Sequence, residues 1–379
     1  MSKKSFAIFL SIVLTVYGLV NYYIFISGWY AAPPAYKTIY LVSFLFLSLS
    51  YIAGRFLERK FLNWFSSIFV WIGSIWLAAM VYFLLIVAAL DILRLLNFII
   101  PFFPQSIYTN YENTKLIVFA VISICVIIIV LAGFINARNP KIKNLNIDIN
   151  KPGNKFKQLK IAVASDIHLG TIISQTRLGR IVKKINSLDA DLVLLPGDVV
   201  DEDIGPVIRH NLGETIRKIK SKYGVYAITG NHEYIGGVEP ACKYLIEHGI
   251  IELRDKTVNI EDSLYIIGRE DRSKRNRKSL DELMEGIDKN LPMILMDHQP
   301  VHLEEAEKAG IDLQLSGHTH HGQLWPFNFI TKKVYELSWG YKKKGNTQYY
   351  VSCGVGTWGP PIRTGNRPEI IALTITFAI

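Results

Sequence analysis

The sequence predicts a membrane bundle of about four helices followed by a soluble domain of the α/β class. The chain has 379 residues and is 50% hydrophobic, but its charges are unevenly distributed. Only 11 of the 42 Lys and Arg residues and 4 of the 32 Asp and Glu residues lie in the first 150 positions. Beyond them, short apolar runs alternate with helical patterns, as in layered α/β domains. We therefore expect a transmembrane domain at 1–137 and a soluble domain at 138–379.

Four apolar runs are long enough, or nearly so, to cross a hydrocarbon core of ~30 Å. They are Phe6–Ile26, Thr38–Ala53, Ile68–Leu90 and Lys115–Ile135, of which the second is the shortest. A buried bundle of soluble helices is the alternative. The fourth run argues against it, because it has no polar face to present to water.

Basic residues predict the orientation of these spans. One side of the membrane would hold most of the cations near the apolar runs, namely Lys3, Lys4, Arg55, Arg59, Lys60, Arg138, Lys141 and Lys143. The other side would hold Lys37, Arg94 and Lys115. Because Lys and Arg concentrate in cytoplasmic loops, the N-terminus and the soluble domain are both expected in the cytoplasm.

Asp91 and Arg94 lie three residues apart at the end of the third run. This spacing predicts a pair on one helix face that anchors the helix at the membrane interface. A functional role at membrane depth is the alternative, since charged residues there often mark sites. The three cysteines, Cys125, Cys242 and Cys353, show neither metal-type spacing nor a disulfide framework.

The soluble part contains eight short apolar runs that we interpret as buried strands. They are Leu159–Ala164, Leu192–Leu195, Val225–Thr229, Leu264–Ile267, Met293–Met296, Leu313–Leu315, Tyr349–Ser352 and Ile370–Thr376. Helical patterns lie between several of them, for example at Thr176–Ser187 and Glu239–His248. The first six runs each end in a polar cluster. Ligands of open α/β folds gather beyond the carboxyl ends of strands, so these clusters are expected to converge on one site.

The converging side chains are carboxylates, imidazoles and an amide. They are Asp166, His168, Asp198, Asn231, His232, His298, His318 and His320. Such a mixed set suits Mn, Fe or Zn rather than Ca. It is too large for one four-coordinate zinc, but sufficient for two divalent ions that share a carboxylate. Two such ions can activate a bridging hydroxide and hold the oxygens of a phosphoryl group, with His232 as the spare proton donor.

The order of the motifs resembles the calcineurin-like metallophosphoesterase family. The motifs are SDIHLG at 165–170, GDVVD at 197–201, GNHE at 230–233, His298, and GHTH at 317–320. The resemblance covers roughly Lys141 to the C-terminus, and the tail VSCGVGTWGPPIRTGNRPEI resembles a bacterial branch with membrane-anchored members. It implies two β-sheets sandwiched by helices. It also implies an enzyme of a bacterial cell membrane that hydrolyses phosphomonoesters, phosphodiesters or pyrophosphates.

The resemblance also implies a role for each matched residue. Asp166, His168 and His320 would bind one metal, and Asn231, His298 and His318 would bind the other. Asp198 would bridge the two metals, for which Mn is the first expectation and Fe or Zn the alternatives. His232 would protonate the leaving oxygen or stabilise its charge. The expected substrate is phosphorylated and is lipid-linked or a nucleotide-sugar-lipid, met at the inner leaflet of the bilayer.

Several nearby residues have alternative interpretations. Asp201 is expected to orient a ligand, Glu233 to be structural, and Asp297 to point away from the site. Arg363 would either bind a phosphate bidentately or pair with Glu369. The basic run at 272–278 would be a solvated loop or would meet anionic lipid headgroups.

His321 departs from the resembled pattern, in which Gly follows the last metal-binding His. Histidine tolerates a left-handed backbone better than most residues. We therefore interpret His321 as a tolerated substitution at the rim of the site that contacts substrate without binding metal.

Two other classes of function compete with a hydrolase. One is a membrane sensor or binding protein with an inert phosphoesterase-like domain, which the complete ligand set disfavours. The other is a transporter, which the scarcity of charges in the membrane runs disfavours. No nucleic-acid partner is expected, because no aromatic platform accompanies the basic run. The sequence predicts no oligomeric state.

Overall fold

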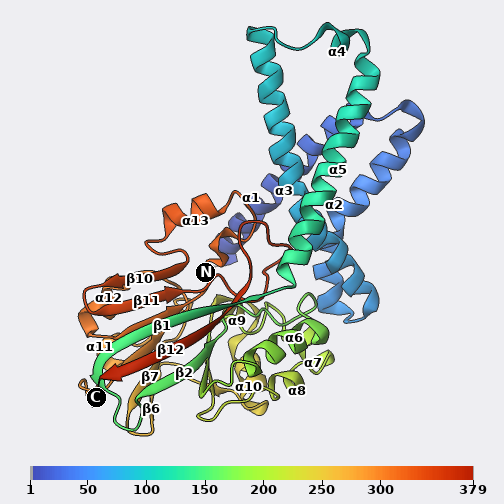
Figure 1. The fold of residues 1–379 in the computed structure, drawn as a ribbon. Helices are drawn as coiled ribbons and strands as arrows, with labels where there is room; N and C mark the ends of the chain where they lie inside the picture. The colour runs from blue at the N-terminus through green and yellow to red at the C-terminus, as the bar shows by residue number, and fades with distance from the viewer. Residues whose placement is uncertain (1–2, 379) are drawn as a thin grey trace. The chain divides into compact units, whose positions relative to one another are not determined.

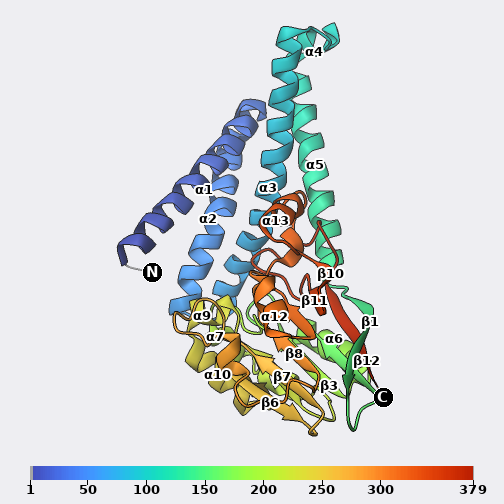
Figure 2. The ribbon, with the colours of Figure 1, turned by 90° about the vertical axis from the view of Figure 1, so that its left-hand side faces the viewer.

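The computed structural model describes the backbone of residues 3–378 and the side chains of residues 7–378, so the side chains of Lys3 and Lys4 lie outside the described part. The chain divides into two compact units, Met1–Ala132 and Gly133–Ile379 (Figures 1 and 2). We call them the membrane unit and the soluble unit.

The membrane unit is built from long apolar helices. These are α1 (Lys3–Ala31), α2 (Lys37–Lys60), α3 (Trp64–Ile99) and α5 (Tyr111–Ala137), with η1 (Pro34–Tyr36) and α4 (Gln105–Thr109) in the connections. The four long helices are each long and apolar enough to cross a membrane. The four predicted spans are thereby confirmed. The second helix continues past the predicted end at Ala53 to Lys60, and Arg55 and Glu58 form an ion pair of 3.0 Å along that last part.

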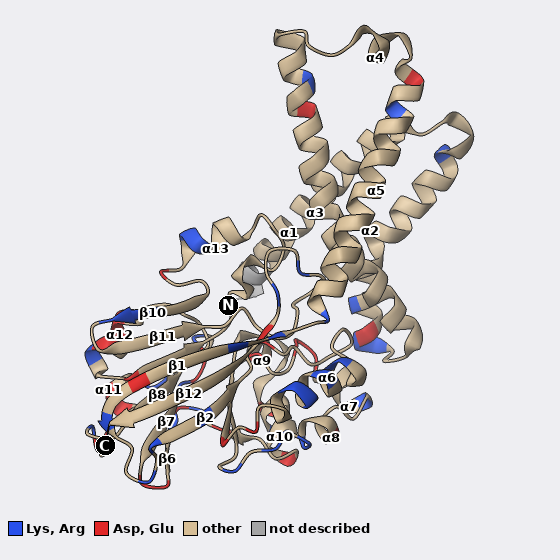
Figure 3. Cartoon of the chain, in the orientation of Figure 1, with Lys and Arg blue, Asp and Glu red and all other residues tan. Residues whose placement is uncertain are grey.

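Helices α2 and α3 approach each other closely at two glycines. A Cβ atom at Gly73 would meet the backbone of Tyr51, and one at Gly54 would meet the backbone of Val70. Small residues at helix crossings allow the close packing that holds helices together in lipid. Charged side chains, in contrast, are confined to regions near the ends of the membrane helices (Figure 3).

The soluble unit contains two six-stranded sheets. The first has the order β1-β12-β2-β3-β4-β5 and the second β10-β11-β9-β8-β7-β6. The strands of the first sheet are β1 (Lys141–Pro152), β2 (Gln158–Val163), β3 (Leu192–Pro196), β4 (Val225–Ile228), β5 (Ile251–Glu252) and β12 (Glu369–Ala378). Those of the second are β6 (Lys256–Ile260), β7 (Leu264–Gly268), β8 (Met293–Met296), β9 (Leu313–Ser316), β10 (Gly340–Lys344) and β11 (Thr347–Val351).

Helices cover the outer faces of both sheets. They are α6 (Gln175–Asn186), α7 (Ile204–Arg209), α8 (Gly213–Ile216), α10 (Val238–Glu247), α11 (Leu280–Leu283) and α12 (Leu303–Ala309). Of the remaining helices, α9 (Asn231–Gly236) follows β4, and η2 (His320–Gly322) and α13 (Asn328–Val334) follow β9. One buried core joins the inner faces of the sheets, for example Ile161 with Ile294 and Leu315. Two further cores join the outer faces to helices, one through α6 and α10 and the other through α11 and α12. The predicted architecture of two sheets sandwiched by helices is confirmed.

All eight predicted strands are present, and four others were not predicted, namely β1, β5, β6 and β10. The pairing explains why the polar clusters converge. In the first sheet β2, β3, β4 and β5 are mutually parallel, and in the second β7, β8 and β9 are parallel. Parallel strands end at the same edge of a sheet, and that edge is where α/β folds place their sites.

Candidate metal centre

Five loops at the carboxyl ends of the strands supply the predicted site residues. Asp166 and His168 follow β2, Asp198 follows β3, and Asn231 and His232 open α9 after β4. From the second sheet, His298 follows β8, and His318 and His320 follow β9. Most of these side chains are buried, with Asp166 and His298 completely so. The two sheets therefore bring the eight predicted residues together.

The first group of ligand atoms comes from Asp166, His168 and His320, whose nearest ligand atoms lie within 4.8 Å of one another. The Nε2 atoms of His168 and His320 are 3.0 Å apart. His320 Nε2 is also 3.5 Å from Asp166 Oδ1. These three side chains form a compact set of the kind that binds a divalent ion.

The second group comes from Asp198, His298 and His318, again within 4.8 Å. Asp198 Oδ2 lies 3.0 Å from His298 Nε2, and Asn231 Oδ1 lies 2.8 Å from His318 Nδ1. Asp198 Oδ2 is also 3.9 Å from His168 Nε2 of the first group. Asp198 is therefore placed between the two groups.

Two buried polar atoms of this cluster lack a hydrogen-bond partner among the described residues. They are Asp166 Oδ2 and His168 Nδ1. A buried polar atom without a partner costs ~1–3 kcal/mol. His298 Nδ1 lies 2.8 Å from the carbonyl oxygen of Pro196, which can only accept, so Nδ1 donates and Nε2 is the nitrogen turned to Asp198. The donor set and its unpartnered atoms fit divalent metal ions.

The electrostatics of the second group also favour a positive charge beside Asp198. Burial raises the pKa of Asp198, but the neighbouring His298 holds that pKa well below its ordinary value. Conversely, burial lowers the pKa of His298, but the Asp198 carboxylate raises it well above the ordinary value. Burial also lowers the pKa of His318 to about 4, which keeps this imidazole neutral and able to act as a ligand.

The ligands occupy an unusual backbone conformation. Asp166 and His168 both have φ of 53°, Asp198 has 51°, His318 has 71° and His320 has 46°. Left-handed φ values are uncommon for residues other than glycine and cluster at functional sites, where the surrounding structure holds them. Two glycines provide the space. A Cβ at Gly230 would meet Asp198, and one at Gly317 would meet Asp166 Oδ2.

His232 lies beside the ligands and is held by two carboxylates. Its Nδ1 is 3.0 Å from Asp201 Oδ1, and its backbone N–H donates to Asp198 Oδ1 at 2.9 Å. Burial lowers the pKa of His232, but the hydrogen bond with Asp201 and the charge of Asp198 raise it to about 9. At neutral pH the imidazole of His232 is therefore in its doubly protonated, positively charged form.

Asp201 orients two imidazoles. Besides its contact with His232, its Oδ1 lies 3.6 Å from Nδ1 of His168. Burial raises the pKa of Asp201, but its contacts with the two histidines lower it below the ordinary value. Glu233 is structural, since its two oxygens accept from the backbone N–H groups of Val200 and Gly230.

Arg363 lies in the interior, which corrects the expectation that it faces substrate or pairs with Glu369. It is completely buried, and its guanidinium donates to Gly356 O at 2.8 Å and to Asn366 Oδ1 at 2.5 Å. A further N–H faces Nδ1 of His320 at 2.9 Å, and since arginine only donates, Nδ1 accepts and Nε2 is left facing Asp166. Arg363 thus positions a predicted ligand.

His321 has the left-handed backbone that was expected, with φ 46° and ψ 41°. The expected place at the rim is wrong, because the residue is only 6% exposed. Its Nδ1 lies 3.1 Å from Ser338 Oγ, and its ring packs 5.1 Å from that of Trp339. The position of His321 therefore gives no support to a substrate contact.

The basic run at 272–278 is partly tied to the domain. Lys274 forms ion pairs with Asp255 and Glu270, and Arg277 pairs with Asp297. Asp297 thus points away from the metal ligands, as expected. Asp201 was expected to orient a ligand, and it contacts His168 and His232. No sequence signal pointed to Arg363 as a support, because its contact with His320 joins segments far apart in the chain.

Comparisons with known proteins extend the motif-based resemblance. A family model described as calcineurin-like phosphoesterase matches residues 159–322. An uncharacterized metallophosphoesterase of Helicobacter pylori is 36% identical over 242 residues, which are 62% of this chain and 64% of the relative. This chain therefore spans less than two thirds of that relative's length.

Two further relatives have different overlaps. A transmembrane protein with metallophosphoesterase domain from Danio rerio is 30% identical over 260 residues, or 64% of this chain and 59% of the relative. An uncharacterized metallophosphoesterase of Aquifex aeolicus is 32% identical over 228 residues, or 58% of this chain but 86% of the relative. With this last match covering most of the relative, and with the ligand set of the family in place, the chain belongs to the calcineurin-like metallophosphoesterase family.

Proposed function

We propose that this protein is a membrane-bound, metal-dependent hydrolase of phosphoester or pyrophosphate bonds. The observation that supports it most is the pair of ligand groups around Asp198, in which Asp166 Oδ2 and His168 Nδ1 are buried without hydrogen-bond partners. Protein interiors rarely leave such atoms unsatisfied unless a ligand or ion serves them.

In this proposal, each metal has its own three ligands. Asp166, His168 and His320 hold one ion, and Asn231, His298 and His318 hold the other. Asp198 is shared, in keeping with its place between the two groups. Two divalent ions, with Mn as the first expectation and Fe or Zn as alternatives, would supply Lewis acidity toward the phosphoryl oxygens and a water activated for attack.

His232 donates a proton to the leaving oxygen. Its raised pKa keeps it protonated at neutral pH, and the Asp201 carboxylate fixes Nδ1 so that Nε2 is the nitrogen available to substrate. The hydrogen bond from the backbone N–H of His232 to Asp198 Oδ1 connects the proton donor to the shared ligand. A shift of Asp198 would therefore also displace His232.

For the substrate we propose a lipid-linked phosphoester or a nucleotide-sugar-lipid at the inner leaflet. Four helices able to span a membrane support a substrate met at the bilayer. The cation-rich loops support a soluble unit in the cytoplasm. A compartment-sensitive reporter fused after Ile379 tests the orientation, and a signal from outside the cytoplasm would contradict it.

The decisive experiment uses the purified full chain reloaded with Mn. Turnover is measured with p-nitrophenyl phosphate, bis(p-nitrophenyl) phosphate and a UDP-acyl-sugar, together with bound metal by elemental analysis. Asp198→Asn is expected to lower kcat/KM by ~10³-fold or more and to reduce bound metal, because several kcal/mol of metal-derived stabilisation is lost.

Asp288→Asn is the matched control, since Asp288 lies on an exposed loop away from the ligands and caps only Asn290. Equal activity of Asp198→Asn and the control would overturn the dinuclear mechanism. A wild-type protein that binds metal and turns over none of the three substrates would favour an inert binding protein instead.

A further inference from the structure

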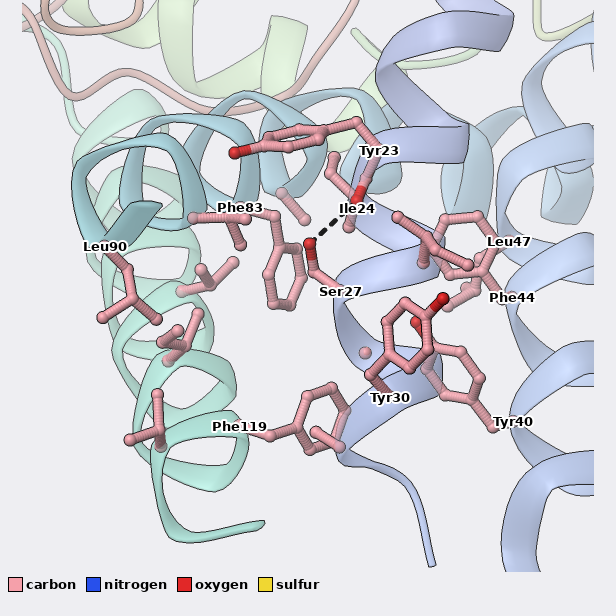
Figure 4. Close-up of a pocket in the computed structure, with 18 of the residues that line it drawn as sticks. Tyr23, Ile24, Ser27, Tyr30, Tyr40, Phe44, Leu47, Phe83, Leu90 and Phe119 are labelled. Carbon is pink, nitrogen blue, oxygen red and sulfur yellow. Dashed lines mark hydrogen bonds between the residues drawn. The ribbon is translucent and has the colours of Figure 1, made fainter. Parts of the chain in front are cut away.

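The membrane unit contains a groove of about 840 Å³ between α1, α2, α3 and α5, which we call the membrane groove (Figure 4). Its walls are mostly aromatic and aliphatic, as the labelled side chains of Ile24, Phe44, Phe83 and Phe119 show. The volume falls in the range of ~300–1,000 Å³ that is typical of sites for small molecules.

Tightly packed rings form the walls of the groove. Phe44 meets the buried Trp76 edge-on, with ring centroids 5.2 Å apart. On the opposite side, Phe119 of α5 contacts Tyr40 of α2 in a similar way at 6.1 Å. The first contact joins α2 to α3, and the second joins α2 to α5, so the rings of α2 lie against both neighbouring helices along the groove. The groove is thus a built feature of the bundle.

The groove is about as long as a hydrocarbon core is thick. Its lining on α5 runs from Tyr111 to Leu131, which is ~30 Å along a helix axis. On α3 it runs from Ile72 to Arg94, or ~33 Å. The hydrocarbon core itself is ~30 Å thick. A polar solute would leave most of this long apolar surface without a matching contact, whereas an acyl chain can cover it along its whole length.

Charges lie at only one end of the groove. Asp91 and Arg94 of α3 line it there together with Lys115 of α5. The predicted pair of Asp91 and Arg94 is present at 2.9 Å, and Tyr23 of α1 donates to the other oxygen of Asp91 at 2.6 Å. Both oxygens of Asp91 are thus engaged by protein donors. The pair therefore lines a cavity and does more than anchor a helix.

The two cations at this end keep donors for a ligand. Arg94 has five N–H donors, of which one bonds Asp91, and Lys115 has three. Lys115 Nζ is 2.8 Å from the Glu112 carboxylate, which takes one of these three donors and leaves two. Guanidinium and ammonium groups are the usual partners of phosphate oxygens.

We propose that the membrane groove binds one phospholipid, with its phosphate at Arg94 and Lys115 and its acyl chains along α3 and α5. A lipid is favoured over a spanning helix of a partner protein, because cations at one end of an otherwise apolar groove match an anionic head group with acyl chains below it. The engaged state of Asp91 disfavours a head group that carries an ammonium, so the preferred lipid is anionic, as in phosphatidylglycerol. The site is independent of the proposed hydrolase.

Photolabelling of the reconstituted full chain tests the site. The protein is placed in phosphatidylcholine vesicles with a trace of phosphatidylglycerol that carries a diazirine in its acyl chain, and labelled peptides are mapped by mass spectrometry. Label is expected on the groove-facing residues of α3 and α5. Ile122→Trp places a larger side chain in the groove and is expected to lower that labelling about tenfold, because the indole takes space that an acyl chain would fill.

The matched control is Ile124→Trp, because Ile124 is 56% exposed and does not line the groove. Helical content by circular dichroism confirms that both variants are folded. Labelling that is uniform over the exposed faces of α5, or that Ile122→Trp and Ile124→Trp change equally, would overturn the proposal.

A second arm tests the head group. Lys115→Gln and Arg94→Gln are each expected to weaken groove labelling about tenfold, as expected for a lost charge-assisted hydrogen bond of ~1.5–3 kcal/mol. Lys37→Gln, which removes a cation stacked on Trp29 away from the groove, serves as control. An excess of unlabelled phosphatidylglycerol should compete, and neutral diacylglycerol should not. Equal competition by diacylglycerol would refute the phosphate contact.

Discussion

The metal centre and the membrane groove place their polar groups in opposite ways. At the metal centre, Asp166, His168, Asp198, His318 and His320 all have left-handed backbone conformations. Within the described residues 3–132 of the membrane unit, no residue has a φ in that region. The soluble unit therefore positions ligands by bending its loops. The membrane unit positions charges along regular helices, because a backbone that left the helix would expose unsatisfied polar groups to lipid.

Gly230→Ala tests the tight backbone at the metal centre and should have the largest effect. A Cβ at this position would meet Asp198, so the shared carboxylate must move. Misplacement of a catalytic group by ~1 Å can reduce the rate ~10²-fold, and we expect a loss of at least that size in kcat/KM with less bound metal.

The control is Gly179→Ala in α6, where a Cβ meets nothing within 4 Å. It is expected to keep full activity and to stabilise the domain by ~0.5–1 kcal/mol, because alanine favours a helix more than glycine. If the two alanine variants were equally active, the loop geometry would not be what positions Asp198.

Asp201→Asn tests how much of the activity depends on a side chain that only orients other residues, here His168 and His232. The amide keeps the size of the carboxylate but loses its charge, so His232 loses the partner that raises its pKa. We expect kcat to fall ~10–100-fold in saturating metal, with bound metal retained. Steady-state kinetics beside elemental analysis separates the two effects. A parallel loss of metal would instead show that His168 depends on Asp201.

Gly73→Leu tests the regular packing of the membrane unit. The new side chain would collide with the backbone of Tyr51 where α2 crosses α3. Overpacking of this kind typically costs ~1–3 kcal/mol, and we expect a lower Tm for the protein in detergent. Gly18→Leu is the control, since nothing lies within 4 Å of a Cβ there. Comparable Tm values for both variants would mean that the crossing is not tightly packed in the membrane.

His321→Gly should have the smallest effect. Glycine relieves the left-handed strain of ~1–2 kcal/mol but loses the contacts with Ser338 and Trp339, so the two changes largely offset. We expect unchanged metal content and a free energy of unfolding within ~1 kcal/mol of wild type. His320→Gly, one residue earlier, should in contrast release metal. Loss of metal from His321→Gly would identify His321 as a further ligand.

The sequence predicted what short-range patterns encode. Hydropathy located the four membrane helices, and apolar runs located the buried strands, because both signals reside in contiguous residues. Strand β1 was missed although Leu145, Ile147 and Ile149 alternate with polar residues, which is the pattern of a half-buried strand. Strand β5 has only two residues, which is too short for a recognisable hydropathy pattern.

The residues of the candidate site were predicted from the sequence, but their supporting contacts and backbone conformations were not. Its ligands share motifs, whereas their supports are contacts between distant segments. Arg363 meets His320 only because the C-terminal tail packs behind β9, and its burial contradicts the usual preference of arginine for water. The left-handed backbone of the ligands had no sequence signal either; it was expected only at the neighbouring His321, where histidine replaces an expected glycine.

The first sheet has one further consequence, for the order in which the chain can fold. Strand β12 lies between β1 and β2, parallel to the first and antiparallel to the second. During synthesis, β1 emerges directly after the last membrane helix, yet its neighbour among the described strands, β12, is made after all the others. Until Glu369–Ala378 leaves the ribosome, β1 has an unpaired edge of the kind that promotes aggregation. The first sheet therefore stays incomplete, with β1 and β2 both lacking β12, until that strand has been synthesised.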